Sequence, residues 1–371
     1  MWMLLTLSYL MIYLAVGLVL IVPGLILQFG NEKKRRSKDV ASDLNKLTVI
    51  IPFRNEANQL EKLLECFNSS EKLPKHIIFV NDHSEDAGPE FLSRHLSKKP
   101  FVILDMPYSK EGKKEAIRFA LTEVKTPYFL TMDADIWFSK TYFGELEKLQ
   151  WKELHVLPVQ MVSHSFIGRI AEIDHLLVNA LNACTSGWKR PFIASGANLL
   201  VKKSSFEKYD RFDLHKHIPS GDDTYLLRDF RDNCAVVSVH TERELTVSTF
   251  LPSSFKAFLA QRIRWAAKTG DIGDSLANLI VLIQAILSGC FVLILWTLLF
   301  FQDGNKVLFF WLAKTTLDIL FFLPFVFRVN RMLTLVWMPV YEWIYPFYAL
   351  TIAFGAYIFR PKWKGRTIRV R

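Results

Sequence analysis

Acidic residues occur in this sequence at a spacing that suits metal binding. The segment "YFLTMDAD" ends with Asp133 and Asp135, directly after an apolar run. Two carboxylates one residue apart at the end of a strand can reach one site, where a hard divalent cation prefers oxygen ligands together with water and phosphate. We therefore predict a Mg²⁺ or Mn²⁺ site that also holds a diphosphate, although a D-x-D motif alone is common by chance.

A second acidic pair, Asp222 and Asp223, lies in "PSGDDTYLLRDF" at the expected start of a helix. One interpretation is structural, because carboxylates at a helix N-terminus complement the helix dipole. The other is chemical: one acid removes a proton from an acceptor hydroxyl, and its acidic neighbour raises its pKa toward a useful value. The residues alone leave both interpretations open.

A loop of small residues, "FIASGANLL", contains Ser195 and Gly196 and leads into an expected strand. Gly196 allows a close approach of backbone or ligand. The loop is therefore a candidate acceptor loop, and a simple turn is the alternative.

A cationic and aromatic motif, "QRIRW", runs from Gln261 to Trp265. Arg262 and Arg264 can hold a diphosphate through their planar guanidinium groups, and Trp265 can stack on a sugar. The alternative is a belt of basic and aromatic residues beside a membrane.

The region around these motifs alternates between strand-like and helix-like segments. Expected strands are 47–53, 76–82, 101–106 and 128–135, and expected helices are 56–70 and 113–124. This alternation with short loops predicts a doubly wound, mostly parallel α/β sheet. Ligands bind at the carboxyl ends of such strands, so Glu56 and Asp82, which follow the first two strands, should lie at the same edge as Asp133.

Apolar segments flank this region. Residues 2–29 carry no charge and are long enough to span a bilayer, and 276–301 and 307–327 have the character of a transmembrane hairpin. A cleavable signal peptide fits the first segment poorly, because it lacks a basic start and a small-residue cleavage site. The basic "NEKKRRSK" after it places the central region in the cytoplasm.

The last apolar segment, 332–358, contains Pro339 and Pro346 and has basic residues on both flanks. A re-entrant or interfacial helical hairpin would keep both flanks cytoplasmic, and we favour it over a third full span after the anchor. In the preceding span, Lys314 and Asp318 are four residues apart, which predicts a structural ion pair.

The chain of 371 residues thus divides into an anchor (1–30), a globular domain (46–272) and a C-terminal membrane region (273–371). The formal net charge is +10, but the Lys and Arg clusters flank the apolar spans. Anionic lipid headgroups explain this better than nucleic acid does. The four scattered cysteines fit a reducing compartment.

The order of the motifs resembles that of membrane-embedded family 2 glycosyltransferases, a group that includes cellulose, hyaluronan and poly-N-acetylglucosamine synthases and ceramide glucosyltransferases. The resemblance covers about 47–270 and rests on "VIIPFRNEANQLEKLLECF", "FVNDHSED", "GKKEAI", "TMDAD", "SGANLLVKK", "GDDTYL" and "QRIRW". It implies a GT-A fold and an inverting transfer from a nucleotide sugar, with a UDP-sugar favoured.

The resemblance also implies roles for individual residues. Asp82 matches a contact to the nucleotide base, Asp135 matches the metal ligand of the D-x-D motif, and Asp223 matches the catalytic base. Its neighbour Asp222 departs mildly from the usual Glu. The expected nucleotide-sugar-binding residues are Glu56, Asp82, Lys113, Asp133, Gln261, Arg262, Arg264 and Trp265.

We expect an integral protein of the cell membrane with a cytoplasmic catalytic domain, acting in cell-envelope glycan synthesis. It would transfer a hexose or N-acetylhexosamine to a lipid or lipid-linked glycan. The few spans make a processive polysaccharide synthase, which needs an export channel, the second choice. A catalytically silent scaffold is disfavoured because every acidic and arginine motif is intact.

Overall fold

The computed structural model describes residues 2–36, 42–96, 100–163, 165–211, 222–252, 254–272, 274–301, 304–358, 362–363 and 366–367. The chain forms two compact units. One, here the sheet unit, comprises Gln28–Val162 and Ile193–Phe250. The other, the helical unit, comprises Met1–Leu27, Ser163–Phe192 and Leu251–Arg371.

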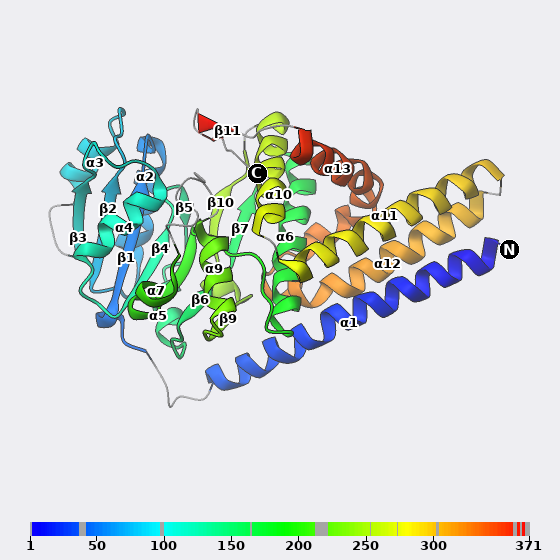
Figure 1. Cartoon of the computed structure of the whole chain (residues 1–371), viewed down its shortest axis with the longest axis horizontal. Helices are drawn as coiled ribbons and strands as arrows, with labels where there is room; N and C mark the ends of the chain where they lie inside the picture. The colour runs from blue at the N-terminus through cyan, green and yellow to red at the C-terminus, as the bar shows by residue number, and fades with distance from the viewer. Residues whose placement is uncertain are drawn as a thin grey trace. The chain divides into compact units, whose positions relative to one another are not determined.

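The sheet unit is built on a seven-stranded sheet of order β3-β2-β1-β4-β8-β6-β9. Its strands are β1 (Leu47–Phe53), β2 (His76–Asn81), β3 (Phe101–Asp105), β4 (Tyr128–Met132), β6 (Leu154–Val156), β8 (Asn198–Lys202) and β9 (Val237–Val239). The strands β3, β2, β1 and β4 are parallel, and β8 is antiparallel to β4 and β6. The predicted mostly parallel sheet is confirmed (Figure 1).

Both faces of this sheet are buried. Side chains alternate along β1, so Val49 and Ile51 join the main hydrophobic cluster, while Ile50 is buried on the opposite face. The helix α2 (Ala57–Ser69) contributes its apolar stripe to that cluster, and α4 (Lys113–Glu123) packs against β1 and β2. Burial on both sides explains why β1 is a continuous apolar run.

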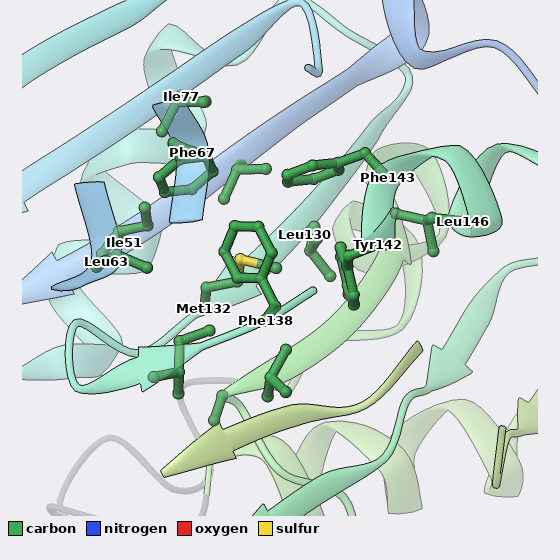
Figure 2. Close-up of a cluster of buried hydrophobic side chains, with 14 of the residues drawn as sticks. Ile51, Leu63, Phe67, Ile77, Leu130, Met132, Phe138, Tyr142, Phe143 and Leu146 are labelled. Atoms are coloured by element: carbon green, nitrogen blue, oxygen red, sulfur yellow. The ribbon is translucent and has the colours of Figure 1, made fainter. Parts of the chain in front are cut away.

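An aromatic core supports the chain that follows β4 (Figure 2). The Phe67 ring lies 5.2 Å from Phe138 and 6.0 Å from Phe143 between centroids. The Tyr142 hydroxyl donates a 2.5 Å hydrogen bond to Asn198 Oδ1. Since Phe138 and Tyr142 follow the D-x-D motif closely in sequence, this packing fixes where that motif leaves the sheet.

The remaining elements of the sheet unit are shorter. A second sheet of order β5-β10-β7 contains β5 (Ile136–Trp137), β7 (Val159–Val162) and β10 (Val247–Phe250). The short helices are η1 (Leu44–Lys46), α3 (Gly88–His95), α5 (Tyr142–Glu147), α7 (Lys203–Tyr209), α9 (Asp222–Asp232) and η2 (Arg243–Leu245).

The helical unit contains long helices. They are α1 (Trp2–Arg36), whose last turns belong to the sheet unit, α6 (Phe166–Ser186), α10 (Phe255–Ile272), α11 (Ser275–Phe301), α12 (Gly304–Arg328) and α13 (Met338–Ile358). In the described part of the chain, three helices are long and apolar enough to span a membrane: Trp2–Gly30, Ser275–Phe301 and Gly304–Arg328. Figure 1 shows α1, α11 and α12 running alongside one another. A small antiparallel pair, β11 (Lys362–Trp363) and β12 (Arg366–Thr367), follows.

Buried charges tie these helices together. Lys314 Nζ lies 2.5 Å from Asp318 Oδ2, so the predicted ion pair is confirmed. The same ammonium also pairs with Glu342 of α13, and Tyr13 of α1 donates a hydrogen bond to Asp318. One cation therefore joins α12 to α13, and its partner Asp318 joins α12 to α1.

The segment 332–358 differs from the expected hairpin. It divides into a 3₁₀ helix, η3 (Met332–Trp337), and the helix α13, which continues through Pro346 without a break. Pro339 lies in the first turn of α13, where its missing N–H has no intrahelical partner to lose. How this segment meets the membrane stays a prediction.

Candidate active site

The loop before α4 is held by Asp82, which follows β2. Asp82 is only 5% exposed, and both of its carboxylate oxygens accept a hydrogen bond from the Gly112 N–H at 3.0 Å. Gly112 has φ 94°, a conformation that a residue with a side chain rarely adopts. This contact places Lys113 at the first position of α4, just beyond the carboxyl end of the sheet.

Lys113 lies among several carboxylates. Its ammonium forms an ion pair with Asp133. Burial by itself lowers the pKa of Lys113, but Asp133, Asp223 and Asp135 together raise that pKa above its usual value. Lys113 therefore stays protonated and offsets part of the negative charge around it.

Asp135 lies in an environment rich in negative charge. Burial, with the carboxylates of Asp133 and Glu56, raises the pKa of Asp135 to about 6, while Lys113 acts to lower it. The Thr249 hydroxyl donates to Asp135 Oδ2 at 3.3 Å. Within the residues that the structure describes, no group of three or more His, Cys, Asp or Glu side chains is arranged to hold a metal ion.

Asp223 is positioned by backbone amides. Its Oδ2 accepts a hydrogen bond from Gly196 N at 2.9 Å, and its Oδ1 accepts one from Thr224 N at 2.8 Å. A Cβ atom at Gly196 would lie 3.1 Å from Lys113 Nζ and 3.8 Å from Asp223 Cβ. The loop with Gly196 thus brings Asp223 close to Lys113 and its partner Asp133.

The other residues of these two motifs have simpler roles. Ser195 caps the turn that enters β8, because its carbonyl accepts from Asn198 N at 3.1 Å. Asp222 begins α9, but its side chain lies outside the described residues.

The residues that lock the loops after β1 and β2 to one another were not predicted from the sequence. Asn55 N donates to Ser84 Oγ at 3.1 Å, and Asn55 Oδ1 accepts from Glu85 N at 2.8 Å. Asp86 Oδ2 accepts from Ala57 N at 2.8 Å. Asn55 has φ 56°, and Asn tolerates this left-handed conformation better than most residues, so the Asn in "FRNEA" was the available signal. These bonds fix the turn that carries Glu56.

The "QRIRW" motif lies on α10 in the helical unit, where the two arginines differ. Arg262 is 4% exposed, and its Nε lies 2.9 Å from Asp174 Oδ2. Its guanidinium is thus paired with a protein carboxylate, and the expectation that it binds the nucleotide sugar stays a prediction. Arg264 Nε and Gln261 Oε1 are buried and have no hydrogen-bond partner among the described residues, and the same holds for the guanidinium nitrogens of Arg262, whose contact with Asp174 is an ion pair. Trp265 lies 6.2 Å from the His175 ring.

Comparison with known proteins agrees with this architecture. Residues 48–209 match the model of the family described as "Glycosyl transferase family 2". A teichoic acid poly(glycerol phosphate) polymerase of Staphylococcus epidermidis is 28% identical over 148 residues, which cover 38% of this chain and 20% of that protein. The glycosyltransferase GlyA of Streptococcus pneumoniae is 30% identical over 104 residues, covering 28% of this chain and 15% of that protein. The chain thus spans a fifth or less of these relatives' length.

Among solved structures, the mannosyltransferase PcManGT from Pyrobaculum calidifontis, in complex with GDP-Man and Mn²⁺, has a TM-score of 0.53. It is 16% identical and matches 90% of this chain and 99% of its own. The doubly wound sheet and this likeness define a GT-A fold. Residues 48–209 thus match glycosyl transferase family 2, in agreement with the family inferred from the order of the motifs.

Proposed function

We propose that this protein transfers a hexose or N-acetylhexosamine, with inversion, from a nucleotide sugar to a hydroxyl of a membrane-linked acceptor. The observation that carries the proposal is the meeting of Asp223, Gly196, Lys113 and Asp133 in the sheet unit. A base, a cation and a D-x-D carboxylate are the groups that glycosyl transfer needs.

Asp223 is the proposed general base. The acceptor oxygen forms a bond to the anomeric carbon, the bond from that carbon to the nucleoside diphosphate breaks, and the acceptor proton moves to the Asp223 carboxylate. The amides of Gly196 and Thr224 hold this carboxylate in place, so it is oriented before the acceptor binds. Lys113 is a cation in the same site and offsets the charge of the departing diphosphate.

A divalent cation fits the residues present. Asp135 and Asp133 would hold Mg²⁺ or Mn²⁺, since the mutual repulsion of Asp135, Asp133 and Glu56 is relieved by an added positive charge. Two carboxylates suit a cation that takes its other ligands from water and the diphosphate. Bound there, the cation would act as a Lewis acid that stabilises negative charge on the leaving group. The mannosyltransferase with the same fold holds Mn²⁺ in its complex.

The membrane-linked acceptor is supported by the three apolar helices, which would hold the catalytic unit at a lipid surface. The name of the staphylococcal relative, a teichoic acid polymerase, fits a role in envelope polymers. The roles of Gln261, Arg264 and Trp265 at the diphosphate and the acceptor stay predictions.

The test uses the full chain in nanodiscs with membrane lipid extract, Mn²⁺ or Mg²⁺, and a panel of radiolabelled UDP- and GDP-sugars. We expect label in the organic-soluble fraction, and a loss of at least ~10²-fold in rate for Asp223→Asn, typical of removing a general base. Asp232→Asn is the matched control, because Asp232 lies at the exposed end of the same helix.

Each alternative has its own result. Label of high mass that grows with time would indicate a processive polysaccharide synthase. Near-normal turnover in Asp223→Asn would remove Asp223 from the role of base. Binding of a nucleotide sugar without any transfer would indicate the scaffold.

A further inference from the structure

A turn with one aromatic and two basic side chains follows α6 in the helical unit. It consists of Trp188, Lys189 and Arg190, here called the WKR turn, and all three residues are exposed. The Trp188 residue is 51% exposed although its side chain is large and apolar. Trp beside Lys and Arg is typical of the boundary between membrane lipid and water, where the ring lies at the level of the headgroups and the cations meet phosphates.

The backbone of the WKR turn closes α6 in a Schellman motif. The Arg190 N–H donates to the Thr185 carbonyl at 3.0 Å, and the Lys189 N–H donates to the Ser186 carbonyl at 2.9 Å. Lys189 has φ 57°, in the left-handed region that this motif uses and that glycine adopts without steric cost. Lysine is less favourable here than glycine, so the folding of the turn alone does not explain this residue.

The residue before the turn packs directly on the backbone of the first apolar helix. A Cβ atom at Gly187 would lie 2.2 Å from the Pro23 carbonyl carbon, and one at Gly24 would lie 2.4 Å from Cys184 Cα. The backbones of α1 and α6 therefore touch, which fixes the WKR turn at the level of Gly24. From Trp2 to Gly24 the helix rises about 33 Å, close to the ~30 Å of the hydrocarbon layer. The turn thus lies where this candidate span leaves the hydrocarbon.

A second candidate span ends near the same level. Helix α12 runs parallel to α1, because Tyr9 lies 5.5 Å from Phe310 between ring centres and a Cβ at Gly17 would lie 2.2 Å from the Phe321 ring. About seven residues further on, or about 10 Å, α1 reaches the WKR turn and α12 ends at Arg328. Two independent spans therefore place the turn at the same boundary.

We propose that the WKR turn binds the headgroups of anionic phospholipids, with the Trp188 ring among the headgroups and Lys189 and Arg190 paired with lipid phosphates. This contact holds the end of α6 at the bilayer surface and makes lipid binding by the protein selective for negative charge. It concerns the helical unit alone, and it stands apart from the proposed glycosyl transfer.

The test is a titration of the full chain in a neutral detergent with phosphatidylglycerol, read as the fraction of protein that retains lipid in native mass spectrometry. We expect Lys189→Gln and Arg190→Gln each to weaken binding about fivefold, and about 25-fold together, since each cation near an anionic surface contributes separately. Neutral phosphatidylcholine should bind more weakly to the wild type and equally to these charge variants.

Lys189→Gly separates lipid binding from the stability of the turn. It removes the charge and places glycine in the left-handed conformation, so the thermal midpoint without lipid should stay the same or rise. The affinity for phosphatidylglycerol should nevertheless fall about fivefold. Trp188→Ala should weaken the binding of both lipids, because the ring contacts headgroups of either charge.

Arg94→Gln combined with Lys140→Gln is the control, because it removes the same charge from two exposed cations of the sheet unit. It should leave the affinity for phosphatidylglycerol unchanged, and an equal loss there would show that net charge alone attracts the lipid. An unchanged affinity in the double variant at positions 189 and 190 would also overturn the proposal. Displacement of the lipid by inorganic phosphate would overturn it in favour of a site for a soluble anion.

Discussion

Lys113 is the residue around which the acidic groups of the sheet unit gather. Its ammonium neutralises Asp133, while Asp135 and Glu56 remain close enough for their repulsion to raise the pKa of Asp135. One cation thus faces several carboxylates, so the site carries an excess of negative charge. This arrangement favours the binding of a further cation, alone or together with a ligand that brings it.

The absence of a side chain at Gly196 leaves room for the end of Lys113. In Gly196→Ala, the new methyl group would lie 3.1 Å from Lys113 Nζ, so the flexible end of that lysine must shift. We expect about a tenfold loss of turnover, equivalent to about 1.4 kcal/mol, with an unchanged thermal midpoint. Gly144→Ala is the control, because a Cβ there meets nothing within 4 Å. Full activity in Gly196→Ala would contradict the assigned geometry.

At the scale of elements, a chain of buried hydrogen bonds joins β6 to β9. The Lys152 N–H donates to His155 Nε2 at 2.6 Å, so His155 Nδ1 carries a hydrogen and donates to His240 Nε2 at 2.9 Å. His240 Nδ1 lies 3.3 Å from Glu242 Oε2. In the neutral ring of His155, Nε2 accepts one hydrogen bond and Nδ1 donates another. Protonation of Nε2 would remove its acceptor lone pair, so the hydrogen bond from Lys152 would be lost.

This arrangement predicts how stability depends on pH. Burial, with His240 and Lys152 nearby, holds the pKa of His155 well below its usual value, against the opposing charge of Glu242. Above about pH 6.5 His155 is neutral in both the folded and the unfolded chain, so it does not lower the free energy of unfolding. Below that pH His155 is protonated only in the unfolded chain, so the free energy of unfolding falls by about 1.4 kcal/mol per pH unit.

The measurement is the thermal midpoint in detergent between pH 7.5 and 5.5, for wild type and for His155→Gln. We expect the variant to be less stable at pH 7.5 but to lose less on acidification. His95→Gln, at an exposed histidine of α3, should keep the wild-type slope. A variant at position 155 with the wild-type slope would show that another group causes the loss.

At the scale of the whole molecule, the candidate spans and the polar catalytic unit must lie in different media. The hydrophobic helices expose many large apolar side chains, including Leu293, Phe300 and Phe327, which is stable in lipid and costly in water. The basic residues after the first span predict that the sheet unit lies in the cytoplasm.

Cys234 offers a native probe of this orientation, because it is an exposed free thiol of the sheet unit. A membrane-impermeant maleimide should label it only after cells are lysed. Cys234→Ser should remove most of that signal, and Cys290→Ser, at an exposed thiol within a candidate span, should not. Labelling of Cys234 in intact cells would place the sheet unit outside.

The sequence by itself determined the elements whose signal is local. The strand at 47–53, the helix after it, the D-x-D motif at the end of the fourth strand and the apolar spans follow from periodicity and composition over a few residues. The parallel sheet followed from their alternation, and the family from the order of the motifs.

Only the tertiary structure decided which side chains meet. Arg262 and Arg264 are alike in sequence, but packing of α6 against α10 gives one of them Asp174 as a partner. Likewise, α13 continues through Pro346, because its contacts with α10 and α12 outweigh the backbone hydrogen bond that proline removes. Pairing and packing depend on residues far apart in the chain, so a local sequence pattern carries no information about which side chains become partners.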